Sequence, residues 1–218
     1  MTAILSPSNT AIEGRVLLRN ISWQTYERIL EDLADCSAPR LTYVRGELEI
    51  MSPTAKHEFV NRVVEIFVST LAEEMEVEIS SLGSTTFKRE DLQRGFEPYS
   101  CFYFANAALV RGKERIDPII DPPPDLVFEV DITSASIDKH SIFAHFKVPE
   151  VWRYDGEKTE ILNLVRDSYV EVEVSSVFAF VTVAALTRFI AESLTSSRIE
   201  WIKQVRTWAR QQKKNKNK

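Results

Sequence analysis

The chain has 218 residues and a formal net charge of −5, with 44% hydrophobic and 27% charged residues. These values are typical of a globular protein with one full core, and the negative charge excludes general attraction to nucleic acid through bulk electrostatics. Two cysteines exclude a disulfide framework. The sequence has no zinc-like Cys/His spacing, no secretory signal and no apolar run of membrane-spanning length. We expect a cytoplasmic protein without a membrane partner.

The first half of the chain predicts a helix, a β-hairpin and a second helix. Residues 16–18 could form a short edge strand, and Ser22 is a typical N-cap for an amphipathic helix. Residues 40–50 predict a hairpin, in whose turn Gly46 can adopt a positive φ. Ser52, as a cap followed by proline, predicts the start of the second helix.

The second predicted helix has an apolar stripe at helical spacing, which we expect to be buried. The members of this stripe are Phe59, Val60, Val63, Val64, Phe67, Leu71 and Met75. His57 lies outside the stripe, in the first turn. It either belongs to a solvated polar face, the interpretation that we favour, or reaches a site at the end of the sheet.

The second half of the chain is rich in β-prone runs. Strands are expected within residues 77–90 (two short ones) and at 99–104, 122–131, 150–155, 160–165 and 169–174, the last three as an antiparallel meander. Helices are expected over residues 137–146 and after Thr182 and Ser197. The final helix could pack on a second subunit, forming a homodimer, or on its own core. This order predicts one α/β (α+β) domain around a mixed sheet flanked by helices.

Residues 122–131 predict a strand that carries acids into an apolar core. Asp125, Glu129 and Asp131 share one face, because side chains alternate along a strand. Burying three carboxylates together is costly unless a positive group lies opposite. A divalent cation is one candidate for that group, and Lys139 is another. Asp125 could also be a turn-forming acid, and Glu129 a buried acid paired with the lysine.

Four stretches, in this order, resemble the Uma2 family, also called DUF820. They are residues 43–53 (YVRGELEIMSP) with His57, 97–103 (EPYSCFY), 123–133 (PPDLVFEVDIT) and 148–155 (VPEVWRYD). The resemblance implies a Uma2-like domain over residues 21–195. Residues 1–20 would then be an N-terminal extension, and residues 196–218 an amphipathic helix with a basic tail.

The family is assigned to the PD-(D/E)XK nuclease superfamily. The resemblance therefore implies a restriction-endonuclease-like mixed sheet and metal-dependent cleavage of phosphodiesters, with DNA as the expected nucleic-acid partner. It implies that Glu129 is the acid of the motif and that Lys139, on the following helix, is its lysine; both are catalytic candidates. Glu129, Asp131 and Asp125 would hold Mg²⁺ or Mn²⁺, a cation that prefers oxygen ligands and activates water beside the scissile phosphate.

One position departs from the family pattern. The family usually has aspartate after the proline of the 97–103 stretch, and this aspartate is a principal metal ligand in the superfamily. This chain has Tyr99 instead, and a phenol is neutral near pH 7. Glu97, Asp125 or Asp131 could substitute for the missing ligand.

Two hypotheses follow for the function. The first is a Mg²⁺-dependent nuclease that uses Glu129 and Lys139, with Glu47 and His57 as accessory candidates. The second is a non-catalytic module that kept the nuclease fold and binds nucleic acid or protein. The acid and lysine set favours the first hypothesis, and Tyr99 and the negative net charge favour the second.

Overall fold

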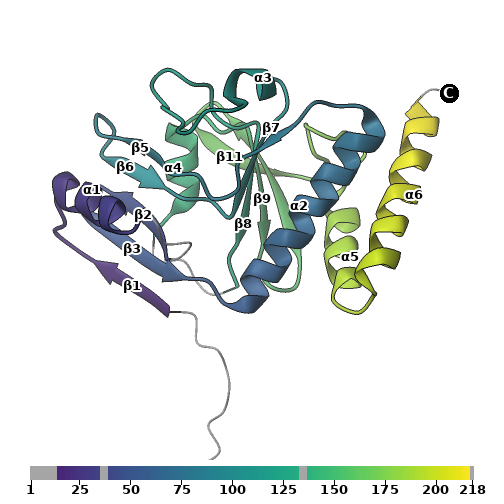
Figure 1. The fold of residues 1–218 in the computed structure, drawn as a ribbon, viewed down its shortest axis with the longest axis horizontal. Coiled ribbons are helices and arrows are strands. Elements are labelled where there is room, and N and C mark those ends of the chain that lie inside the picture. Colours follow the sequence, from purple (N-terminus) through teal and green to yellow (C-terminus); the bar gives the residue numbers. More distant parts are fainter. Residues whose placement is uncertain (1–13, 35–38, 133–136, 217–218) are drawn as a thin grey trace, which may run out of the picture.

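The computed structural model describes residues 14–34, 39–132 and 137–216, which form a mixed α/β fold (Figure 1). The strands are β1 (Gly14–Leu18), β2 (Arg40–Val44), β3 (Glu47–Ser52), β4 (Ser80–Ser81), β5 (Phe87–Arg89), β6 (Arg94–Phe96), β7 (Ser100–Tyr103), β8 (Leu126–Val130), β9 (Glu150–Tyr154), β10 (Thr159–Val165) and β11 (Ser168–Val172). The helices are α1 (Trp23–Asp32), α2 (Ala55–Met75), α3 (Ala107–Val110), α4 (Lys139–His145), α5 (Val183–Ser193) and α6 (Arg198–Lys216). Residues 1–13 of the expected extension and residue 133, the last of the third family-like stretch, lie outside this description.

The strands form two sheets rather than one. The five-stranded sheet has the order β1-β3-β2-β6-β5, and the six-stranded sheet has the order β11-β10-β9-β8-β7-β4. The expected hairpin is confirmed as β2 and β3, with Gly46 at φ +93 in its turn. The expected edge strand is β1, which pairs with β3. The expected mixed sheet flanked by helices is the six-stranded one, since β8 and β9 are parallel and its other pairs antiparallel.

Helices cover both faces of the six-stranded sheet. Figure 1 shows α2 with the α5–α6 pair on one side and α4 on the other. Phe128 and Val130 of β8 belong to the core under α2, and Val127 belongs to the core under α4. The alternation predicted for this strand is therefore confirmed, and it places Glu129 on the α4 side.

The start and the buried stripe of α2 differ from the prediction. The helix begins at Ala55 with Thr54 as its N-cap, rather than at Ser52-Pro53. Phe59 is 43% exposed, and His57, expected on a solvated face, is only 2% exposed. The buried stripe is shifted because it includes polar residues such as Asn61. The Asn61 amide can be buried because it donates a hydrogen bond to the Tyr99 carbonyl at 3.1 Å.

The final helix packs on its own chain. Trp201, Val205 and Ala209 of α6 are buried in the core under α2. Ion pairs between Arg210 and Glu74, at 2.8 Å, also join the two helices. Of the two alternatives, packing of α6 on its own core is the one observed. No helix in the described ranges is both long and apolar enough to cross a membrane.

Candidate functional site

A buried ion pair joins β8 to α4. The Lys139 Nζ atom lies 2.7 Å from Glu129 Oε2, and the two side chains are 14% and 5% exposed. Lys139 is the first residue of α4, after the N-cap Asp138. Because helical Cα–Cβ bonds tilt toward the helix N-terminus, a lysine in this position can reach back to the preceding strand. Burying such a pair costs desolvation energy, which makes it a candidate functional site.

A second ion pair lies beside the first. Arg153 of β9 donates to Asp131 Oδ2 from Nε at 3.3 Å and from Nη2 at 3.0 Å, and to Glu160 from Nη1 at 3.0 Å. Burial would lower the pKa of Arg153, but these hydrogen bonds to two carboxylates outweigh it and raise that pKa. Arg15 of β1 approaches the other oxygen of Asp131 at 3.7 Å. Asp131 is thus held between two guanidinium groups.

The two ion pairs line one cavity, which we call the β8–α4 pocket. It has a volume of about 400 Å³, and its lining includes Glu129, Asp131, Lys139 and Arg153. The apolar ring of Phe143, from α4, forms part of its wall. The two ion pairs therefore face the same space, together with Asp138 and His140, and the cavity has the size of a small-molecule or nucleotide site.

The structure does not bring Asp125 and Glu97 to this pocket. Asp125 Oδ2 accepts hydrogen bonds from the N–H groups of Phe104 at 2.6 Å and Ala105 at 3.1 Å. Glu97 accepts from the Leu41 N–H at 2.8 Å and from the Thr86 hydroxyl at 2.6 Å. Both carboxylates hold the backbone in place, and both are already satisfied where they lie.

The two accessory candidates also lie elsewhere. The Glu47 side chain is 42% exposed and pairs with Arg19 at 3.1 Å. His57 Nδ1 lies 2.7 Å from the Thr54 hydroxyl oxygen, within the first turn of α2. The His57 ring stacks on that of Tyr99, with 5.9 Å between centroids. These contacts stabilise the surface hairpin and the helix start, and neither residue lines the β8–α4 pocket.

Tyr99 contacts Glu129 through its backbone N–H. Its N–H lies 3.3 Å from Glu129 Oε1, within hydrogen-bonding distance. Its ring is fully buried in the core under α2, where the phenol donates to Met51 Sδ at 3.6 Å. The Arg40 guanidinium covers the ring at 4.4 Å from its centroid. The tyrosine therefore does not fill the β8–α4 pocket, and it supplies no ligand there.

The carboxylate oxygens of the pocket are the type of ligand that a hard cation prefers, but they are few. In the described ranges, no group of three or more His, Cys, Asp or Glu side chains is placed to hold a metal ion. Glu129 and Asp131 are two oxygen donors that face one pocket. Mg²⁺ often binds through one or two carboxylates and completes its shell with water and substrate phosphate. The site therefore fits a weakly held cation that competes with Lys139 and Arg153 for the carboxylates.

Arg153 and Arg15 are absent from the sequence candidates. Arg153 carried a weak signal in the sequence: it lies two residues after apolar Val151 in a predicted strand, so the two share a face. In the structure it lies opposite Glu129 in the parallel register. Arg15 carried none, because its approach to Asp131 depends on how the two sheets meet. Its chain position, before the family-like stretches, gives no hint of the contact.

Comparison with known proteins gives a family match over most of the chain. The model of the Uma2 family, described as "Putative restriction endonuclease", matches residues 23–195. A solved structure from Anabaena variabilis ATCC 29413, described as a "putative nuclease belonging to DUF820", is 13% identical. That alignment covers 74% of this chain and 98% of the other, with a TM-score of 0.47. No curated protein gives a match.

Proposed function

We propose that this chain, which belongs to the Uma2 family, is a nuclease that hydrolyses phosphodiester bonds in the β8–α4 pocket. One observation carries the proposal: Lys139 and Glu129 lie 2.7 Å apart and line a pocket that also contains Asp131. These are the acid and the lysine that the family resemblance implies, and they come from separate elements. We propose DNA as the substrate and the cytoplasm as the location of the protein. A homodimer remains a prediction.

The cationic side chains would bind the phosphodiester. The Lys139 ammonium would donate to a non-bridging phosphate oxygen and stabilise the negative charge that develops during hydrolysis. To do so it must exchange its partner Glu129 for the phosphate. Arg153, whose planar guanidinium can donate two parallel hydrogen bonds, lies on the Asp131 side of the same pocket.

The two acids would hold the divalent cation. Glu129 and Asp131 are the residues that would ligate Mg²⁺ or Mn²⁺, and the cation, when bound, would supply an activated water and neutralise phosphate charge. A cation at Glu129 would also free Lys139 from its ion pair. The arrangement therefore favours joint binding of cation and phosphate over binding of either alone.

A specific observation favours a second candidate function. Tyr99 directs its ring into the core. Of the three carboxylates that line the pocket, Asp138 is engaged as the N-cap of α4, which leaves Glu129 and Asp131. A chain with this donor set could bind nucleic acid through the same cationic side chains without cleaving it. The two functions share a ligand and differ in the chemical step, so binding and cleavage must be measured separately.

The test is cleavage of supercoiled plasmid DNA with Mg²⁺ or Mn²⁺, beside a DNA-binding assay in Ca²⁺. We expect the wild-type chain to nick the plasmid, and Lys139→Gln to cleave about 10²–10³-fold more slowly, the usual loss when one charge-stabilising donor is removed. Lys203→Gln is the matched control, because Lys203 forms a surface pair with Glu200 at 3.1 Å on α6. Circular dichroism checks that each variant is folded.

Three outcomes separate the hypotheses. The nuclease hypothesis is supported if the wild-type chain cleaves the plasmid, Lys139→Gln abolishes this cleavage and Lys203→Gln preserves it. Binding without cleavage by the wild-type chain, in either metal, rejects the nuclease and favours the non-catalytic module. No binding and no cleavage would reject both functions.

A further inference from the structure

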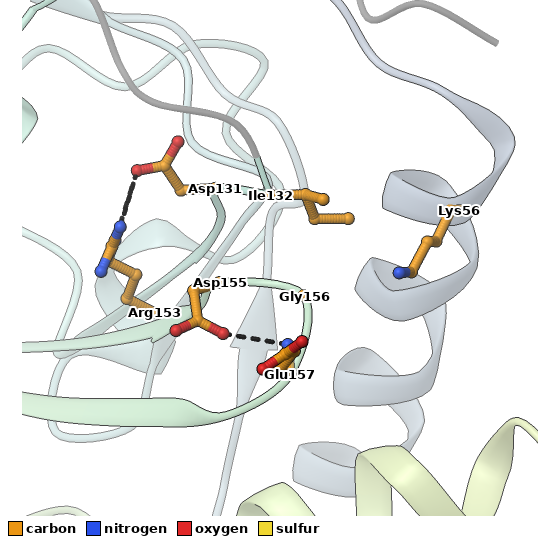
Figure 2. A pocket seen from close by; sticks show the side chains of 7 residues that line it. All are labelled: Lys56, Asp131, Ile132, Arg153, Asp155, Gly156 and Glu157. Atoms are coloured by element: carbon orange, nitrogen blue, oxygen red, sulfur yellow. Dashed lines mark hydrogen bonds and ion pairs between the residues drawn. The ribbon is translucent and has the colours of Figure 1, made fainter. Parts of the chain in front are cut away.

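A second cavity, the Lys56 pocket, adjoins the β8–α4 pocket. It has a volume of about 520 Å³, and its lining includes Lys56 of α2, Asp131, Arg153 and the turn after β9 (Figure 2). Asp131 and Arg153 line both cavities. The two pockets therefore share the Asp131–Arg153 ion pair as part of their linings.

The far wall of the Lys56 pocket carries the Lys56 ammonium group. Figure 2 shows Lys56 extending from α2 toward the turn at Gly156 and Glu157. Lys56 forms no hydrogen bond or ion pair with any residue in the described ranges, in contrast to Arg153 and Lys139. It lies in the first turn of a 21-residue helix, where the helix dipole adds positive potential. An anion that enters the pocket meets an available donor there.

The shape of the opposite wall depends on a glycine. Gly156 has φ +105, and a Cβ atom there would approach Ile132 Cγ2 to 3.2 Å. A side chain at this position would be strained and would push the turn away from Ile132. The turn is thus fixed close to the end of β8, and the pocket stays open between Ile132 and Lys56.

Acidic groups on that turn restrict where an anion can bind. The Asp155 carboxylate accepts hydrogen bonds from the N–H groups of Glu157 and Lys158, each at 2.9 Å. Backbone hydrogen bonds, chiefly from Lys158, hold the pKa of Asp155 below its usual range, so the group is ionised. Glu157 is exposed at the rim. Both acids would repel an anion from the turn and favour its binding on the α2 side, at Lys56.

We propose that the Lys56 pocket binds the phosphate adjacent to the scissile one on the same nucleic-acid strand. The inference rests on the proposed function, since the β8–α4 pocket must hold the scissile phosphate. It adds that the substrate is a strand with at least two successive phosphates, and that Lys56 contacts the second of them. A phosphate contact of this kind adds affinity without reading base sequence.

The salt dependence of binding tests this contact. The logarithm of the association constant of a single strand falls with log[salt] by about 0.7 for each phosphate neutralised. We expect Lys56→Gln to reduce this slope by about 0.7 and to weaken binding to oligothymidylate and oligoadenylate equally. Lys56→Arg, which keeps the charge, should retain the slope. Glu157→Gln should tighten binding, because it removes a repulsive charge at the rim.

The probe is a fluorescein-labelled single strand of about eight nucleotides, titrated by anisotropy in Ca²⁺ over a range of sodium chloride concentrations. Lys214→Gln is the matched control: Lys214 is an exposed lysine of α6, beside Lys213, which pairs with Glu76 at the other end of α2. If Lys56→Gln binds the strand with the same salt dependence as the wild-type chain, the inference is overturned. The proposed function is unaffected by that result. No binding of this single strand by the wild-type chain would also overturn the inference, and the plasmid assay would then decide the proposed function on its own.

Discussion

At the residue scale, the composition of the site depends on which acidic side chains are already hydrogen-bonded to the backbone. Glu129 is paired with Lys139, and Asp131 is paired with Arg153. Each carboxylate can exchange its side-chain partner for a metal ion, and each cation can exchange its partner for a phosphate. Asp125, by contrast, accepts two backbone N–H groups. The sequence predicts these acids on one face of a strand, but β8 spans only Leu126–Val130, and the sequence cannot show which loop will supply the competing N–H donors.

Tyr99 offers a prediction at this scale. Tyr99→Asp should lower the free energy of unfolding by about 3–5 kcal/mol, the range for truncating a large buried aromatic side chain, because the ring is fully buried under α2. It would also place a third carboxylate near Glu129, since the residue 99 N–H lies 3.3 Å from Glu129 Oε1. We expect Mn²⁺ to raise the melting temperature of this variant more than that of the wild-type chain.

Urea denaturation and thermal melts with and without Mn²⁺ provide the measurement. Tyr99→Phe is the control: it keeps the ring and removes the hydrogen bond to Met51, so it should change stability by about 1 kcal/mol or less. Equal stability of Tyr99→Asp and the wild-type chain would contradict the burial of this ring.

At the element scale, periodicity predicted most of the strands and helices. The β8 alternation, the β2–β3 hairpin and the β9–β10–β11 meander follow the expected pattern. The start of α2 does not, because Thr54, rather than Ser52, caps the helix. Thr54 forms a capping box with His57, three residues later. The prediction missed it because the usual partner at that position is Glu or Gln rather than histidine.

The packing of α6 gives a prediction at this scale. Trp201 is 2% exposed, and its Nε1 donates to the Phe189 carbonyl of α5 at 2.7 Å. Trp201→Ala should therefore lower the free energy of unfolding by about 3–5 kcal/mol. Ile199→Ala, on the same helix at a position 69% exposed, should change it by about 0.5 kcal/mol or less.

Urea denaturation of the two variants measures the difference. A small effect of Trp201→Ala would mean that α6 is not an integral part of the core. In that case, the alternative that α6 packs on a second subunit would regain support, and sedimentation velocity would test it.

At the scale of the whole molecule, a series of ion pairs joins the two sheets at the site. Arg15 of β1 pairs with Glu49 of β3 at 3.1 Å and approaches Asp131, at the end of β8, at 3.7 Å. Arg153 continues the series from Asp131 to Glu160 of β10. The sequence predicted one mixed sheet, so it could not predict a contact that forms only where two sheets meet.

The series also explains the electrostatics of the site. Each carboxylate of the β8–α4 pocket that could hold a cation already has a protein cation as partner. Such pairs satisfy buried charges at a desolvation cost, and they can be displaced by a divalent cation and a phosphate together.

The central claim, that Glu129 and Asp131 form a cation site in competition with Lys139, is tested most directly by calorimetric titration of Mn²⁺ into the metal-free chain. We predict about one Mn²⁺ per chain, with binding lost in Glu129→Gln and at least as tight in Lys139→Gln, because the latter variant removes the competing ammonium. Absence of binding in both the wild-type chain and Lys139→Gln would contradict the claim.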